Sequence, residues 1–123
     1  MDNKTCLTVM ALAVLAVGAI ACGGGGGGAD AAKAAEGHKL FKGTCATCHG
    51  PEGRGMPKLG KDLYNNKFTQ SLSDTELIEF LKKGRSAGDP LNERGVDMPP
   101  RGGNPVLTDA DLALIVAYIR SLQ

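Results

Sequence analysis

The chain has 123 residues, with 14 basic and 13 acidic side chains and a formal net charge of +1 at pH 7. This balance argues against nucleic-acid binding, which usually needs a clustered surplus of basic residues. With no tryptophan, two tyrosines and three phenylalanines, the chain has few large side chains for a core, and small domains of this kind usually depend on a disulfide, a metal or a cofactor. Length and composition exclude a large two-domain enzyme, a multi-span membrane protein and a disordered chain.

The first 21 residues have the pattern of an export signal. A short polar start is followed by an uncharged run, residues 6–21, which is shorter than the roughly 20 residues of a membrane-spanning helix. The run leads into the sequence GAIAC at residues 18–22, which resembles the lipobox of bacterial lipoproteins. The resemblance implies that residues 1–21 are removed and that Cys22 receives a lipid. Ordinary cleavage and an uncleaved anchor are alternatives, and all three predict export across the cytoplasmic membrane.

Residues 22–35 are predicted to form a flexible tether. Six consecutive glycines, residues 23–28, are followed by an alanine-rich stretch. Glycine has no side chain to bury and loses the most conformational entropy on ordering. We therefore expect a flexible linker that joins the lipid to one folded domain over residues 36–123.

Two of the four cysteines belong to this domain. Cys45 and Cys48 stand in the sequence CATCH, which ends at His49 and has the C-x-x-C-H pattern of c-type haem attachment. Positions i, i+3 and i+4 share one face of a helical turn, so both thiols can form thioether bonds to one haem while the imidazole faces its iron. A zinc site, a thioredoxin-type dithiol and a structural disulfide are the alternatives.

The rest of the domain predicts helices joined by long loops. One helix is expected over residues 37–42, and a second after Ser73, which forms a capping box with Glu76. A third is expected from Thr108, with an apolar stripe at three- and four-residue spacing formed by Leu112, Ile115, Val116 and Ile119. No segment alternates between apolar and polar residues, so the predicted fold class is all-α. The Gly/Pro-rich stretches 50–62 and 84–107 are long enough to suggest a binding role.

This arrangement resembles the class I c-type cytochromes over nearly all of residues 36–123. Gly37 and Phe41 match the glycine and the aromatic residue at which the family's first helix crosses its last helix. Ile115 and Tyr118 match the apolar and aromatic pair of that last helix. The resemblance implies a small cytochrome c fold, with three or more helices and long loops wrapped around one covalently bound haem.

The resemblance also assigns roles to individual residues. Cys45 and Cys48 match the haem attachment positions, and His49 matches the proximal iron ligand. Residues 60–63 fall where many members read Gly-Pro-x-Leu, and Lys61 replaces the proline whose backbone carbonyl supports the proximal histidine. The carbonyl of Lys61 is still available for this purpose, but lysine does not stiffen its presentation as proline does.

The second axial ligand is predicted to be Met98. The family places its methionine in the last long loop before the C-terminal helix, which is the position of Met98 and the two prolines that follow it. Met56 is an alternative, but it lies seven residues after His49 and would have to round the haem edge. His38, solvent and an open site are the others, although His38 is expected to be a solvated side chain.

An iron with histidine and methionine ligands has no free position for a substrate, and the methionine sulfur favours ferrous iron. The sequence therefore predicts a membrane-tethered monohaem electron carrier rather than an enzyme. Its place is the periplasmic or extracytoplasmic side of a membrane, and its partners are a redox donor and acceptor of a respiratory chain. Alternatives are a fixed haem subunit of an oxidase or reductase complex, and a haem enzyme or ligand sensor with an open distal site.

Overall fold

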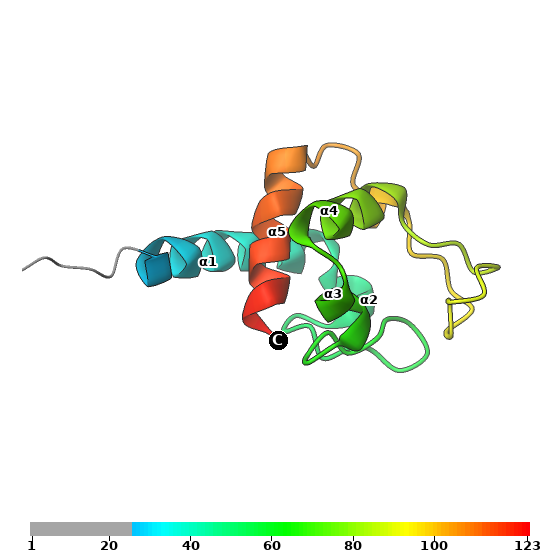
Figure 1. Ribbon diagram of the computed structural model, residues 1–123. Helices are drawn as coiled ribbons and strands as arrows, with labels where there is room; N and C mark the ends of the chain where they lie inside the picture. Colours follow the sequence, from blue (N-terminus) through cyan, green and yellow to red (C-terminus); the bar gives the residue numbers. More distant parts are fainter. Residues whose placement is uncertain (1–25) are drawn as a thin grey trace, which may run out of the picture.

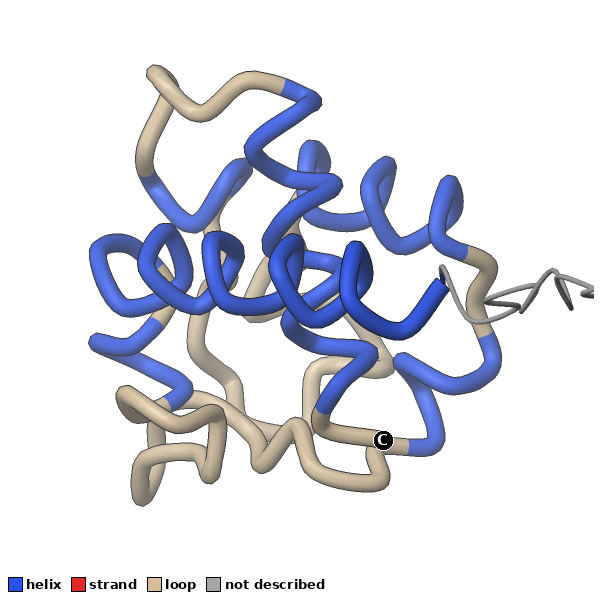
Figure 2. Tube along the Cα trace, turned by 90° about the vertical axis from the view of Figure 1, so that its left-hand side faces the viewer, coloured by secondary structure: helices blue, strands red, loops and turns tan. Residues whose placement is uncertain are grey.

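The computed structural model describes residues 26–123, and the secondary structure in this part of the chain is helical (Figure 1). The elements are α1 (Gly26–Thr44), α2 (Ala46–His49), α3 (Lys67–Ser71), α4 (Asp74–Lys83), the 3-10 helix η1 (Pro100–Gly103) and α5 (Asp109–Ser121). Extended pairing within residues 26–123 is limited to an isolated antiparallel bridge between Arg85 and Met98. The predicted all-α class is confirmed, and long loops join the helices (Figure 2).

Helices α1 and α5 cross at the centre of the molecule (Figure 1). A Cβ at Gly37 would collide with the backbone carbonyl of Leu114, so only glycine allows this close approach. Next to this contact the rings of Phe41 and Tyr118 pack with their centroids 5.0 Å apart at 59°, and Ile115 is fully buried. The residues expected at the crossing of the first and last helices are therefore found there.

Capping boxes begin the two helices that were predicted from their start signals. The Ser73 hydroxyl accepts a hydrogen bond from the backbone N–H of Glu76 at the start of α4, and the Glu76 carboxylate accepts one in return. Thr108 and Asp111 form the same reciprocal pair at the start of α5. Two of the four free N–H groups at the start of each helix thus find a partner, and the sequence predicted this reciprocal pair for Ser73 and Glu76.

A short helix that the sequence analysis did not predict, α3, is held between the larger ones. The side chain of Asn66 accepts hydrogen bonds from the backbone N–H groups of Phe68 and Thr69. The Arg120 guanidinium of α5 then donates to the carbonyls of Thr69 and Leu72, at the end of α3. It also pairs with Asp74 of α4 at 2.8 Å, so one side chain joins three helices.

The start of α1 differs from the predicted domain boundary. Residues 26–35 were predicted to belong to a flexible tether, and this is wrong because they form the first turns of α1. Alanine is the strongest helix former and occurs four times between residues 31 and 35, and Asp30 pairs with Lys33 across one turn at 3.8 Å. This part of the helix is mostly exposed and projects beyond α5 (Figure 1).

The predicted signal peptide, residues 1–21, and the expected lipid site Cys22 lie outside the described residues. Among residues 26–123, no helix combines the length and apolar character needed to cross a membrane.

The apolar core joins α1, α4 and α5 to two loops. Phe41 from α1 and Leu77 and Leu81 from α4 meet the apolar face of α5. The buried apolar side chains are Phe41, Leu63, Leu77, Leu81, Leu107, Leu112, Ile115, Val116, Tyr118, Ile119 and Leu122. Many of them also form the wall of a cavity, which is the candidate site.

Candidate functional site

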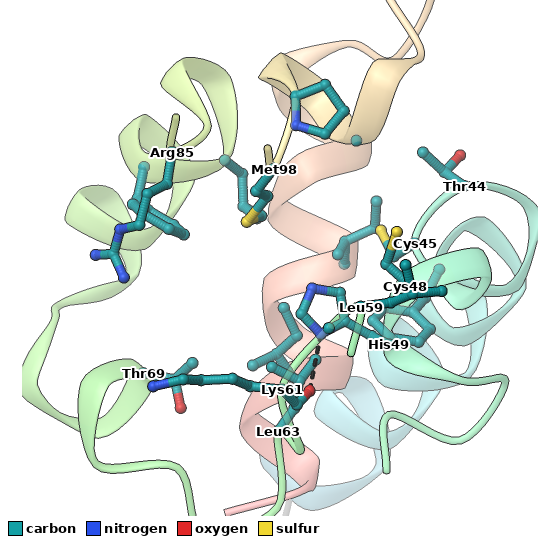
Figure 3. Close-up of a pocket in the computed structure, with 18 of the residues that line it drawn as sticks. Thr44, Cys45, Cys48, His49, Leu59, Lys61, Leu63, Thr69, Arg85 and Met98 are labelled. Carbon is teal, nitrogen blue, oxygen red and sulfur yellow. Dashed lines mark hydrogen bonds between the residues drawn. The ribbon is translucent and has the colours of Figure 1, made fainter. Parts of the chain in front are cut away.

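A cavity of about 350 Å³ lies between α2, α4, α5 and the loops that follow α2 and α4 (Figure 3). Its wall is mainly apolar and includes Phe41, Leu63, Leu77, Leu81, Leu112, Ile115 and Ile119. The side chains of Cys45, Cys48 and His49 line it on one side, and Met98 lines it from another (Figure 3). The structure therefore brings the four predicted site residues of the domain to one cavity.

The two cysteines are placed by the single turn of α2. The N–H of His49 donates to the carbonyl of Cys45 at 3.0 Å, so Cys45, Cys48 and His49 lie on one helical face, as the spacing predicted. Both thiols are free and half-buried. Burial, with a smaller contribution from Cys48, raises the pKa of the Cys45 thiol to about 11. Dithiol oxidoreductases depend on a lowered thiol pKa, so this environment argues against the thioredoxin-type alternative.

His49 is oriented by the loop that follows it. Its Nδ1 donates a hydrogen bond to the carbonyl of Lys61 at 2.9 Å (Figure 3). A carbonyl can only accept, so Nδ1 carries the proton and Nε2 keeps its lone pair for a metal. The loop comes this close because residue 60 is glycine: a Cβ there would lie 2.9 Å from Nδ1 of His49. The carbonyl of Lys61 thus makes this contact although residue 61 is not proline.

The side chain of Lys61 makes a second connection. Its ammonium pairs with the carboxylate of Glu93 at 2.6 Å, and both side chains are exposed. Lys61 belongs to the loop after His49, whereas Glu93 belongs to the loop that leads to Met98, and both residues line the cavity. One residue therefore contacts His49 through its backbone and the opposite loop through its side chain.

Met98 is half-buried and faces the cavity across from His49 (Figure 3). Its backbone pairs with Arg85: each residue donates its N–H to the carbonyl of the other at 2.8 Å. Among the described residues, Met56 does not line the cavity and is 40% exposed. Of the two candidate methionines, Met98 is therefore the one that shares a cavity with His49.

His38 also lies away from the cavity lining, but the prediction that it is solvated is wrong. Its ring stacks on Tyr118 of α5 with centroids 4.4 Å apart at 18°. Its Nε2 lies 3.0 Å from the carbonyl of Pro51 and 3.4 Å from the carboxylate of Glu52. The side chain is therefore half-buried and links α1, α5 and the loop after the cysteine motif.

Sequence reasoning did not single out Arg85. It follows Gly84, which ends α4, and its guanidinium lies over the rings of Phe68 and Phe80. The pairing with Met98 bridges 13 positions, and no short-range pattern reports such a contact. The sequence offers one signal for this role: Arg85 comes directly after the glycine that ends a helix, and the chain has only five aromatic residues on which an arginine could stack.

Comparison with known proteins agrees with this geometry. The family model described as cytochrome c matches residues 34–123. The chain is a member of the cytochrome c family. A relative named cytochrome c-555 from Chlorobaculum tepidum is 35% identical over 84 residues, 68% of this chain and 70% of that protein. Another cytochrome c-555, from Prosthecochloris aestuarii, is 34% identical over 86 residues, 68% of this chain and 81% of that protein. No solved structure matches the chain significantly.

As a cytochrome c, the chain binds haem c covalently and transfers electrons, and it is not an enzyme. The residues present fit this cofactor. Cys45 and Cys48 have the spacing of the attachment motif, both thiols are unbridged, and the proton on Nδ1 of His49 leaves the other ring nitrogen free to ligate. The apolar wall suits a porphyrin, because burial of its large hydrophobic surface is favourable.

Proposed function

We propose that this cytochrome is a one-electron carrier in which His49 and Met98 are the axial ligands of a single haem iron and Cys45 and Cys48 form its thioethers. The observation that carries the proposal is the common cavity, which the metal-binding side chains of His49 and Met98 line from different sides. The tautomer of His49, fixed by the carbonyl of Lys61, supports the proximal assignment. The exposed position of Met56 and the stacking of His38 on Tyr118 support Met98 as the distal ligand.

The side chains around the cavity suit electron transfer better than catalysis. Haem supplies a reversible couple between ferric and ferrous iron. If His49 and Met98 both ligate the iron, no position on the metal would be left for a substrate. The apolar wall, including Leu77, Leu112 and Ile115, excludes water and keeps the surroundings similar in both oxidation states. A thioether ligand in such a setting favours the reduced form and raises the potential.

A redox titration of the purified, matured protein tests this function. We expect all of the haem to follow a single reversible one-electron curve in both directions. We also expect the ferric protein to react only slowly with hydrogen peroxide, because an iron with two protein ligands has no free position for it. Rapid reaction with peroxide, or hysteresis between the oxidative and reductive titrations, would instead favour a haem enzyme or sensor with an open distal position.

The lipid anchor and the export of the protein form a second, finer part of the proposal. The lipobox-like sequence that ends at Cys22 supports cleavage after residue 21 and lipidation of the cysteine. The anchor would hold the haem domain on the periplasmic or extracytoplasmic face of a membrane, beside a redox donor and acceptor of a respiratory chain. Helix α1 would form part of the spacer between the membrane and the domain, because it starts at Gly26 and its first turns are exposed.

Cell fractionation tests the anchor. The wild-type protein should be found in membranes and take up labelled fatty acid, whereas Cys22→Ala should lose the label. A Cys6→Ala variant is the matched control, because that cysteine lies within the predicted signal peptide. A wild-type protein that stays in membranes without taking up the label would show that an uncleaved segment holds it instead.

A further inference from the structure

The bridge between Arg85 and Met98 closes the base of a loop. The two residues exchange backbone hydrogen bonds of 2.8 Å in each direction, and residues 86–97 form the loop between them. Inside the loop, the side-chain amide of Asn92 donates to the carbonyls of Ser86 and Val96 at 2.9 and 2.8 Å. The position of Met98 therefore depends on whether this bridge stays closed.

The side chain of Arg85 is largely buried, which is unusual for an arginine. Only 17% of it is exposed. Its guanidinium carbon lies 4.4 Å from the ring centre of Phe68 in α3 and 4.9 Å from that of Phe80 in α4, and the two rings pack edge to face. A guanidinium stacked on aromatic faces gains cation–π attraction that grows as the group loses solvent.

The same guanidinium also contacts the loop. It donates to the carbonyl of Leu91 at 3.3 Å, and its Nε lies 3.9 Å from the carboxylate of Asp89. Arg85 lines the cavity as well. It thus connects two helices, the loop and the backbone of Met98.

We propose that Arg85 is a positioning residue for the thioether of Met98. The inference rests on the proposed role of Met98 as the distal ligand. Any residue except proline can form the two backbone hydrogen bonds at position 85, so the arginine side chain acts by fixing its own main chain against Phe68 and Phe80. The fixed main chain in turn keeps Met98 in register with the cavity. Without the side chain, the bridge opens more often and the sulfur leaves the iron more often.

Binding of imidazole to the ferric protein measures this opening. Imidazole takes the distal position only when the sulfur has left, so its apparent affinity is proportional to the population of the open state. For Arg85→Ala we expect about a tenfold rise in apparent imidazole affinity, the effect of losing two partly desolvated cation–π contacts. Arg85→Lys keeps the charge but not the flat stacking, so a rise of about threefold is expected.

Two control variants separate positioning from general stability and from charge. Ser73→Ala removes the cap at the other end of α4 and should lower the melting temperature without raising imidazole affinity. Lys83→Ala removes one exposed positive charge two residues from Arg85 and should leave the affinity at the wild-type value. An equal rise in either control would overturn the inference, because the effect would not be specific to Arg85.

The optical spectrum separates failure of the inference from failure of the proposed function. A ferric wild-type protein without the weak long-wavelength charge-transfer band of iron–methionine ligation would overturn both. If that band is present and disappears in Met98→Ala, unchanged imidazole affinity in Arg85→Ala overturns the inference alone. If Arg85→Ala does not mature, Arg85→Lys decides: a threefold rise supports the role and wild-type affinity refutes it.

Discussion

Nδ1 of His49 donates a hydrogen bond to the backbone carbonyl of Lys61 over 2.9 Å. This contact places the proton on one ring nitrogen and leaves the other for the metal. The loop that carries the carbonyl is held in turn by a hydrogen bond of 2.9 Å from the N–H of Gly60 to the carbonyl of Cys48. A backbone contact with the cysteine motif therefore helps to hold the loop that carries the carbonyl of Lys61.

The role of the Lys61 side chain, which pairs with Glu93, should be separable from the role of its backbone carbonyl, which supports His49. The hydrogen bond from Lys61 and, to a smaller extent, its charge hold the pKa of Glu93 below its usual value. In Lys61→Met the pKa of Glu93 should return toward that value, while the carbonyl still supports His49 and the ferric spectrum stays the same. NMR titration of the Glu93 carboxyl carbon gives the pKa, and an unchanged value would show that the pair does not form in solution.

The same substitution predicts a pH-dependent difference in stability. Because folding lowers the pKa of Glu93, the pair stabilises the fold above the ordinary glutamate pKa of about 4.3. The advantage of the wild type over Lys61→Met should therefore be present at neutral pH and vanish as the pH falls through the lowered pKa. The effect should be small, since both side chains are exposed. Chemical denaturation at a series of pH values from 7 downward measures it, and a difference that does not shrink as the pH falls through the Glu93 pKa found by NMR would contradict the account.

Two glycines of α1 should respond in opposite directions to alanine. At Gly37 a Cβ would meet the backbone of Leu114, so Gly37→Ala forces α1 and α5 apart and should cost about 3 kcal/mol or more. At the exposed Gly43 a Cβ has no neighbour within 4 Å, so Gly43→Ala should stabilise the helix by up to about 1 kcal/mol. Urea unfolding of the matured proteins checks both, and similar stability of the two variants would argue against the tight crossing.

The fold should depend on haem attachment. A variant with both Cys45→Ala and Cys48→Ala would have to keep its cavity of about 350 Å³ without the group that fills it. The apolar wall of this cavity would then face water, and small domains have too little stability, about 5–15 kcal/mol, to bear such a loss of burial. Circular dichroism should therefore show a largely unfolded chain. A native-like helical signal with a cooperative melt would show that the apolar core is sufficient alone.

The helices that have a local start signal in the sequence were predicted correctly. The start signals at Ser73 and Thr108 correctly placed α4 and α5, because a capping box is a contact between residues three apart. Helix α3 was missed because its five residues are too few to show periodicity, although Asn66 is a good capping residue. The early start of α1 was missed because the neighbouring glycines suggested a tether, while the alanines that follow them favour a helix.

In the site, too, the local contacts were predicted from the sequence and most of the tertiary contacts were not. Cys45, Cys48 and His49 lie within one helical turn, so their spacing was enough to predict that they share a face. The position of Met98 beside the same cavity was predicted from family resemblance. Its partner Arg85 was not predicted, because the bridge between them joins residues that only the tertiary fold brings together. The stacking of His38 on Tyr118 was missed for the same reason.

The optical spectrum of the matured ferric protein, recorded beside Met98→Ala, tests the central claim most directly. Ligation by His49 and Met98 predicts a weak long-wavelength band from sulfur-to-iron charge transfer in the wild type. The band should disappear in Met98→Ala and persist in Met56→Ala, which changes an exposed methionine outside the cavity lining. High-spin iron in the wild type, or a band that survives Met98→Ala, would contradict the account and make an open or differently ligated distal site the better description.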